Sequence, residues 1–99
     1  MYYREYFFYL KQRLPEKCYN ILQECYNNQK EDIEQNYQNL KNATNDIAIK
    51  HILIPIKINL YSMDYEILLR ENLIEPHPTE PNRFRIDRFG IYLLHYSNS

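Results

Sequence analysis

Glycine is almost missing from this chain, which has one glycine and five prolines among its 99 residues. A Gly-rich loop that would cradle phosphate groups is therefore excluded, and no segment has the Gly, Ser or Pro content of a flexible linker. A chain of this length, with 44% hydrophobic residues, can build one modest core. We therefore expect a single domain over residues 1–99.

Long apolar runs are missing too. The chain begins with charged residues and tyrosines where a secretory signal would need an apolar stretch. No later segment approaches the roughly 18 consecutive apolar residues of a membrane span. We expect an intracellular, cytoplasmic protein that makes no membrane contact.

Cysteine is scarce. Cys18 and Cys25 lie seven positions apart on an expected helix, which separates them by about 10 Å along its axis and excludes an intrahelical disulfide. Two interpretations stay open, namely reduced thiols that are buried as small hydrophobic side chains, or a bridge between two chains. Burial is the more usual state in a cytosolic protein.

Residues in a pattern typical of enzymes are also missing. The histidines His51, His77 and His95 have no cysteine or carboxylate at metal-ligand spacing. Cys18 falls in an expected buried stripe, which disfavours a nucleophile. We therefore expect no catalytic residues, no metal site and no cofactor, so the protein is not expected to be an enzyme.

An excess of charge of one sign is missing as well, because 12 Lys and Arg residues nearly balance 13 Asp and Glu residues. Affinity for DNA depends on how many phosphates Lys and Arg neutralise, so a nucleic-acid role would require these residues to cluster locally. The 11 tyrosines, with many Asn and Ile residues, suggest an AT-rich coding genome. A phage or a mobile element would fit that composition.

Apolar residues recur every three or four positions through the N-terminal segment, which predicts a first helix with an aromatic stripe. The stripe consists of Tyr3, Tyr6, Phe7, Leu10 and Leu14. Pro15 suits the first position of a second helix, which we expect to continue through Tyr26.

Residues 30–42 form a third amphipathic helix or a continuation of the second, because Ile33, Tyr37 and Leu40 repeat at spacings of four and three. A stripe this narrow is typical of coiled-coil pairing, so residues 15–42 are expected to be either a dimerisation arm or a flap on the core. The aromatic N-terminal helix is likewise either sandwiched inside one molecule or part of a homodimer interface. The expected interface consists of Tyr2, Tyr3, Tyr6, Phe7, Ile33, Tyr37 and Leu40.

The second half of the chain starts after a polar break near residues 42–45. An apolar run then predicts a buried helix that ends near Ile54, because Pro55 cannot continue it. A further helix is expected over residues 58–71. Asn72 follows at a position where a helix end needs the left-handed conformation that glycine or asparagine can adopt.

Two short alternating segments, 73–76 and 83–87, flank a turn and predict a β-hairpin. Asp87 then caps a last helix through Tyr96. This helix is expected to bury Phe89, Leu93 and Tyr96 or their immediate neighbours.

Several segments of the second half together resemble a known superfamily. They are Asp46–Ala48, Ile54–Pro55, Leu68–Glu75 and Phe84–Gly90. Residues 44–96 resemble the winged helix-turn-helix superfamily, with Asn72 in place of a glycine and Gly90 in register. The resemblance implies an α+β, mostly α, fold in which a recognition helix is followed by a two-stranded wing. Residues 1–42 are then an N-terminal helical extension to a winged-helix core at 44–96.

The resemblance implies double-stranded DNA as a partner. Wing arginines Arg83, Arg85 and Arg88 would contact phosphates or a narrow minor groove. The alternative is a solvated face, or pairing with Glu75 and Glu80 across the hairpin. The other expected DNA contacts are Lys50, Lys57, Asn59, Ser62 and Met63.

Two functions stay open. The first is a homodimeric DNA-binding transcription regulator of a phage or mobile element. The second is a winged-helix-like protein–protein interaction module, such as a phage-encoded antagonist of a host defence or transcription protein. The near-neutral charge and the acidic residues Asp64, Glu66 and Glu71 favour the second.

Overall fold

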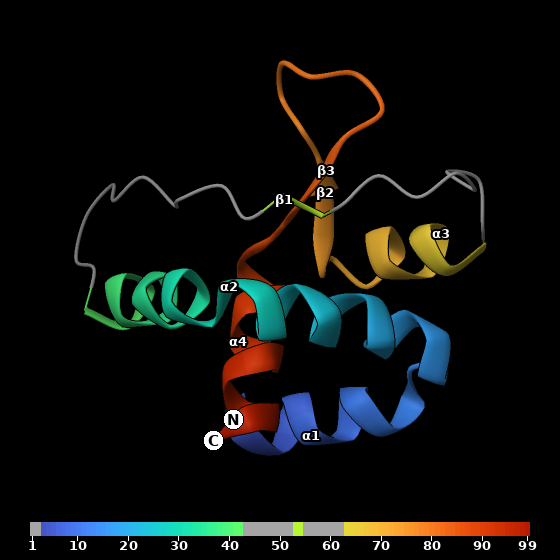
Figure 1. The fold of residues 1–99 in the computed structure, drawn as a ribbon. Coiled ribbons are helices and arrows are strands. Elements are labelled where there is room, and N and C mark those ends of the chain that lie inside the picture. Colours follow the sequence, from blue (N-terminus) through green and yellow to red (C-terminus); the bar gives the residue numbers. More distant parts are fainter. Residues whose placement is uncertain (1–2, 43–52, 55–62) are drawn as a thin grey trace.

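The computed structural model describes residues 3–42, 53–54 and 63–99, which are mostly helical and include a small antiparallel sheet. The helices are α1 (Tyr3–Arg13), α2 (Glu16–Asn42), α3 (Met63–Arg70) and α4 (Arg88–Asn98), and the strands are β1 (Leu53–Ile54), β2 (Ile74–Pro76) and β3 (Phe84–Ile86). In Figure 1, α1, α2 and α4 lie together at the bottom, and the β2–β3 hairpin projects from the opposite side of the molecule.

The first two helices meet at Pro15, as the sequence predicts. The Leu14 amide still donates to the Leu10 carbonyl at 3.1 Å, and the Cys18 amide donates to the Pro15 carbonyl at 3.0 Å. Pro15 has no amide proton to donate, and this costs nothing at the start of a helix, where the first amides have no intrahelical partner. The chain therefore turns sharply here and places α1 beside α4 (Figure 1).

The sequence left open whether residues 15–42 form one helix or two. α2 consists of two helical segments that meet at a kink, because Gln29 has φ −134° and ψ 33°, outside the helical region. Both parts bury one face: Cys18, Leu22 and Cys25 lie before the kink, and Ile33 and Tyr37 lie after it. Residues 15–42 therefore cover the molecule's own core, and their interpretation as a free dimerisation arm was wrong.

The expected dimer interface needs a related correction. Phe7, Ile33 and Tyr37 have exposed fractions of 1%, 0% and 7%, so the fold buries them within one molecule. The Phe7 ring lies 5.8 Å from the Tyr92 ring and 6.0 Å from the Tyr96 ring of α4.

The remaining residues of that expected interface differ in their placement. Tyr6 is 40% exposed, and Leu40 is partly buried against the core. Tyr2 lies outside the described residues, and Tyr3 begins α1.

α2 and α4 are joined by a seam of polar and aromatic contacts. The Glu34 carboxylate lies 2.7 Å from His95 Nδ1 and accepts a hydrogen bond of 2.8 Å from the Tyr26 hydroxyl. One turn along α2, the Tyr37 ring stacks on the His95 ring at a centroid distance of 3.5 Å. These contacts fix the part of α2 after the kink against α4.

α3 ends as the sequence predicts. Asn72 has φ 61°, and its amide donates to the Leu69 carbonyl at 3.1 Å. The Leu73 amide donates to the Leu68 carbonyl at 3.0 Å. These two hydrogen bonds supply donors to carbonyls that would otherwise lack one at the helix end, and they direct the chain into β2.

The predicted hairpin is confirmed, with Ile74 opposite Ile86 and Pro76 opposite Phe84. β1 adds a further strand on the other side of β3, giving the order β1-β3-β2. The expected helix up to Ile54 was therefore wrong at its end, because a short apolar run rich in β-branched residues suits a buried strand as well as a helix. The start of that helix, and residues 58–62 of the next one, lie outside the described residues.

Asp87 caps α4, as predicted, by accepting a hydrogen bond from the Arg88 amide. The helix buries Gly90, Ile91, Leu93 and Leu94. Leu93 was expected in this face, whereas Phe89 is 39% exposed and lies at its rim.

The only glycine of the sequence lies where α4 crosses the start of the hairpin. A Cβ atom on Gly90 would collide with the backbone carbonyl oxygen of Leu73 and with Cγ2 of Ile86. The Leu73 oxygen is also fixed, because it accepts a hydrogen bond of 3.0 Å from the Asp87 amide. The close approach of helix and hairpin therefore requires glycine at this position.

We expect Gly90→Ala to lower the free energy of unfolding by at least about 2 kcal/mol, because the added methyl group must displace backbone. Urea denaturation followed by circular dichroism measures this, with Ser97→Ala on the same helix as the control. A loss within about 0.5 kcal/mol of the control would contradict the close approach.

Candidate interaction surface

α3 and the β2–β3 hairpin, residues 63–88, form one side of the molecule, which we call the hairpin face (Figure 1). Tyr65 of α3 stacks on Phe84 of β3 at a centroid distance of 5.5 Å. Leu68 of α3 and Ile74 of β2 are both buried in the core. The helix and the hairpin are therefore held together from inside, and their polar side chains remain at the surface.

Two of the three arginines expected on a wing lie close to carboxylates of the same hairpin. Arg85 lies opposite Glu75 in the strand register, and its Nε donates to the Glu75 carboxylate. Arg83 Nε lies 3.8 Å from a carboxylate oxygen of Glu80, which is too far for a hydrogen bond, so these two groups form a looser ion pair than Arg85 and Glu75. The structure thus favours the alternative in which these arginines pair across the hairpin.

Arg88 differs from the other two. It begins α4, its residue is exposed, and no carboxylate of the described residues pairs with its guanidinium group. Of the three arginines expected on a wing, it is the one whose charge stays open to a ligand in the described part of the chain.

The hairpin loop is held by its own hydrogen bonds. The Nδ1 atom of His77 accepts from the amides of Thr79 and Glu80 at 3.2 and 3.0 Å, and the His77 amide donates to the Arg83 carbonyl at 2.9 Å. Asn82 has φ 60°, the left-handed conformation that allows the loop to turn back into β3. The imidazole therefore serves the loop conformation and shows no sign of a ligand role.

Of the expected DNA contacts outside the wing, the described residues include only Met63, whose residue is 72% exposed at the start of α3. Lys50, Lys57, Asn59 and Ser62 lie outside the described residues. Near Met63, the exposed residue Glu66 adds negative charge.

The segment that forms the hairpin face has more acidic than basic residues. Between residues 63 and 88 the chain has six Asp and Glu residues and four Arg residues, a formal charge of −2, and one of these carboxylates, Glu71, lies 3.5 Å from Arg13 of α1. A small excess of acidic groups disfavours contact with a phosphate backbone and favours contact with cationic groups. The local clustering of cations that a nucleic-acid role requires is therefore not found in this part of the chain.

Both cysteines are buried and neither forms a disulfide within the chain, which supports the simpler of the two interpretations. Cys18 Sγ lies 3.7 Å from both the backbone oxygen and a carboxylate oxygen of Asp64, so it joins α2 to α3. Burial, followed by the charge of Asp64, raises the pKa of the Cys18 thiol to about 11. The thiol acts as a packing group and a weak donor to Asp64.

Sequence reasoning missed the most exposed aromatic residues. On α1, Phe8 is 63% exposed and Tyr9 is 60% exposed, whereas the expected interface residue Phe7 faces inward. Helical periodicity alone could not separate these neighbours, because six of the residues from Tyr2 to Tyr9 are aromatic. Contacts with α4 determine which side of α1 faces inward, and the local sequence pattern gives no information on these contacts.

Within residues 3–42, 53–54 and 63–99, no group of three or more His, Cys, Asp or Glu residues is arranged to hold a metal ion. None of the helices in these ranges combines the length and apolar character needed to cross a membrane.

The chain matches no protein-family model, no curated protein and no solved structure.

We expect both cysteines of the native protein to resist a disulfide reagent at pH 8, because their side chains are buried. The raised pKa further lowers the thiolate fraction of Cys18 about a hundredfold relative to an ordinary thiol with pKa 9.0. Absorbance of the released thiolate measures the rate. Gln12→Cys supplies an exposed control thiol that should react at once. Unfolding by denaturant should expose Cys18 and Cys25, which should then react as well. Rapid reaction of Cys18 without denaturant would contradict its burial.

Proposed function

We propose that the protein is a protein–protein interaction module on a winged-helix-like scaffold, and that its acidic hairpin face binds a basic surface of another protein. The observation that carries this proposal is the pairing of Arg83 and Arg85 with carboxylates of their own hairpin. It leaves a wing with little free positive charge.

The order of elements supports the winged-helix interpretation. The elements follow one another as the resemblance implies, in the order α3, left-handed Asn72, β2–β3 hairpin and Asp87-capped α4. Gly90 lies at the crossing of α4 and the hairpin, which agrees with the register of the resemblance. β1 pairs with β3 and ties the preceding chain to the same sheet.

The charge balance argues against duplex DNA as the main ligand. Duplex binding is driven largely by cations that replace condensed counterions, so a protein needs several unpaired Lys or Arg groups on one surface. On the hairpin face the side chains of Arg83 and Arg85 would first have to leave their carboxylates. The net charge of −2 for residues 63–88 would still oppose the approach of phosphates.

The same features suit a basic protein partner. Glu66 offers an exposed carboxylate, and Met63 beside it offers a flexible apolar side chain that can fit an irregular surface. Proteins that bind nucleic acids have basic patches of the required sign. A host DNA- or RNA-binding protein involved in defence or transcription is therefore the partner class we propose, in line with a phage or mobile-element origin.

A second candidate function is duplex DNA binding by the hairpin, as in a transcription regulator. It is favoured by the exposure of Arg88 and by the projection of the hairpin beyond the helices (Figure 1). In this case Arg88 would contact a phosphate, and Arg83 and Arg85 would exchange their carboxylates for phosphates on binding.

A matched pair of charge reversals tests the proposed function. Immobilised protein is exposed to a nuclease-treated bacterial lysate, with Glu66→Lys on α3 compared with Glu31→Lys on α2, since both residues are exposed. We expect wild type and Glu31→Lys to retain a basic protein in stoichiometric amount, and moderate salt to elute it. Glu66→Lys should retain at least about tenfold less of this protein. Equal retention by all three proteins would refute a role of the hairpin face.

A second experiment separates the two functions through the carboxylates of the hairpin. We expect wild type to show negligible affinity for AT-rich duplexes at low salt, and Glu75→Gln/Glu80→Gln to bind at least about tenfold more tightly, because Arg83 and Arg85 then lose their partners. Fluorescence anisotropy measures both, and Glu16→Gln/Glu31→Gln on α2 is the control with the same charge change. Tight binding by wild type that is lost in Arg83→Ala/Arg85→Ala/Arg88→Ala would instead establish the DNA function.

A further inference from the structure

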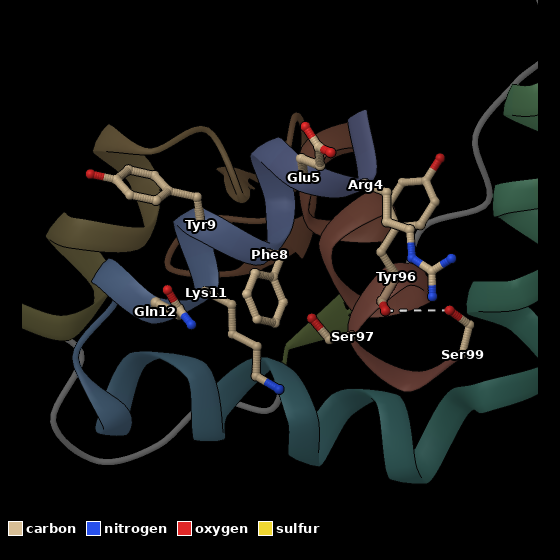
Figure 2. A pocket seen from close by; sticks show the side chains of 9 residues that line it. All are labelled: Arg4, Glu5, Phe8, Tyr9, Lys11, Gln12, Tyr96, Ser97 and Ser99. Carbon is tan, nitrogen blue, oxygen red and sulfur yellow. Dashed lines mark hydrogen bonds between the residues drawn. The ribbon is translucent and has the colours of Figure 1, made fainter. Parts of the chain in front are cut away.

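The outer face of α1 forms a groove with the end of α4, on the side of the molecule away from the hairpin (Figure 1). The groove has a volume of about 620 Å³, and Figure 2 shows Phe8 in the middle of its lining residues. Phe8 is 63% exposed and does not fill the core, because Phe7 and Leu10 occupy the inner face of the same helix. An aromatic ring is therefore held open to solvent in a hollow of the surface.

Two cations of α1 lie about one turn before and one turn after Phe8. Arg4 precedes it by about 6 Å along the helix axis, and Lys11 follows it by about 4.5 Å. At about 100° per residue, both side chains leave the helix on the same side of Phe8, whereas Glu5 leaves it on the opposite side. Figure 2 shows this arrangement, with Phe8 between Lys11 and Arg4 and with Glu5 pointing away from them. The groove side of α1 thus has the order cation, ring, cation.

The groove has more positive than negative charge. Among its described lining residues, Arg4 and Lys11 are basic and Glu5 is acidic. No carboxylate of the described residues forms an ion pair with Arg4 or Lys11. Lys11 is also partly oriented, because its ammonium group lies 4.7 Å from the centroid of the Tyr19 ring on α2. Two cations on either side of Phe8 are therefore available to an anionic ligand.

A third cation acts on the end of the groove that Tyr96 lines. The hydrogen bond with Tyr37 and burial raise the pKa of the Tyr96 hydroxyl, whereas the positive charges of Lys41 and Arg4 oppose this rise. Lys41 belongs to the last turn of α2 and is exposed. The positive potential of the groove therefore extends to the end of α2.

A single strand of nucleic acid presents the complementary order. Each of its bases is flanked by a phosphate on either side, and its unpaired bases are free to stack on an aromatic ring. Phosphates can bind Arg4 and Lys11 while the base between them covers Phe8. In a duplex the bases are stacked inside the double helix, so a duplex would leave the ring of Phe8 exposed.

We propose that this groove binds single-stranded nucleic acid, with one base stacked on Phe8 and the neighbouring phosphates held by Arg4 and Lys11. Such contacts read no base sequence, because every base has an aromatic face and every nucleotide a phosphate. The groove is separate from the hairpin face, so this binding goes beyond the proposed function. The partner class proposed for the hairpin face, a DNA- or RNA-binding protein, would bring such a strand with it.

An acidic peptide fits the groove less well. Its carboxylates could meet Arg4 and Lys11, but it would also need an apolar side chain between them to cover Phe8. Only particular peptide sequences have that order, whereas every step of a single strand has it. The two ligands also differ in what they require of Phe8, because a base needs the flat aromatic face and an apolar side chain needs only an apolar surface.

Fluorescence anisotropy of labelled oligo-dT and oligo-U of about twelve nucleotides tests the proposal. We expect both to bind with a dissociation constant below about 100 µM at low salt. Phe8→Leu should weaken binding at least about fivefold, because it removes the stacking face, and Phe8→Trp should stay within about threefold of wild type. A preference of more than about tenfold for one oligonucleotide would show whether DNA or RNA is the ligand.

The dependence of binding on salt tests the phosphate contacts. Arg4→Gln/Lys11→Gln should weaken binding at least about tenfold at low salt and reduce the slope of log Kd against log salt by about 1.4, because two phosphate contacts are lost. Lys17→Gln/Lys30→Gln on α2 makes the same change in charge at exposed positions outside the groove lining. This control should alter the slope by less than about 0.5. Circular dichroism confirms that each variant is folded, and Arg4→Gln carries this test if the double variant is not.

A wild-type dissociation constant above about 1 mM for both oligonucleotides would overturn the inference. Equal binding by wild type and Phe8→Leu would do the same, as would a duplex of the same length that binds as tightly as the single strands. A peptide of Glu and Phe residues that binds at least about tenfold more tightly than either oligonucleotide would indicate an acidic protein partner instead. No partner protein is present in these measurements, so their outcome is independent of the function proposed for the hairpin face.

Discussion

The packing of α4 between α1 and α2 is the contact on which the rest of the structure depends. α4 presents Tyr92 and Tyr96 to Phe7 of α1, and on its other side His95 meets Glu34 and Tyr37 of α2. A chain of 99 residues can form only a small core. Residues from α1 and α2 and residues from the second half of the chain therefore contribute to one buried cluster. The N-terminal helices are therefore part of the core and not an appendage to it.

That shared core explains which features of the fold the sequence could predict. Local chemistry determines Pro15 at the start of α2, Asn72 at the end of α3 and the Asp87 cap of α4, and each was predictable because its cause lies within a few neighbouring residues. The strand at Leu53–Ile54 was missed because its identity depends on pairing with β3, about thirty positions later.

The candidate surfaces also contain some features that neighbouring residues determine and others that only the tertiary structure determines. The pairing of Arg83 and Arg85 with Glu80 and Glu75 could be predicted as one alternative, because alternation in a hairpin brings such residues together. The outward direction of Phe8 could not be predicted, since it depends on which side of α1 meets α4. Local rules therefore describe the hairpin face well, whereas the exposed face of α1 requires the tertiary structure.

The end of β2 has a consequence for the behaviour of the chain at high concentration. β2 is an outer strand of three residues in the order β1-β3-β2, and it finishes at the exposed Pro76, which has no amide proton to offer. The side chain of its central residue, Glu75, is held by Arg85. A short edge with a charge and a proline is a poor template for adding strands from other molecules. The β2 edge of the sheet is therefore protected against the addition of strands from other molecules.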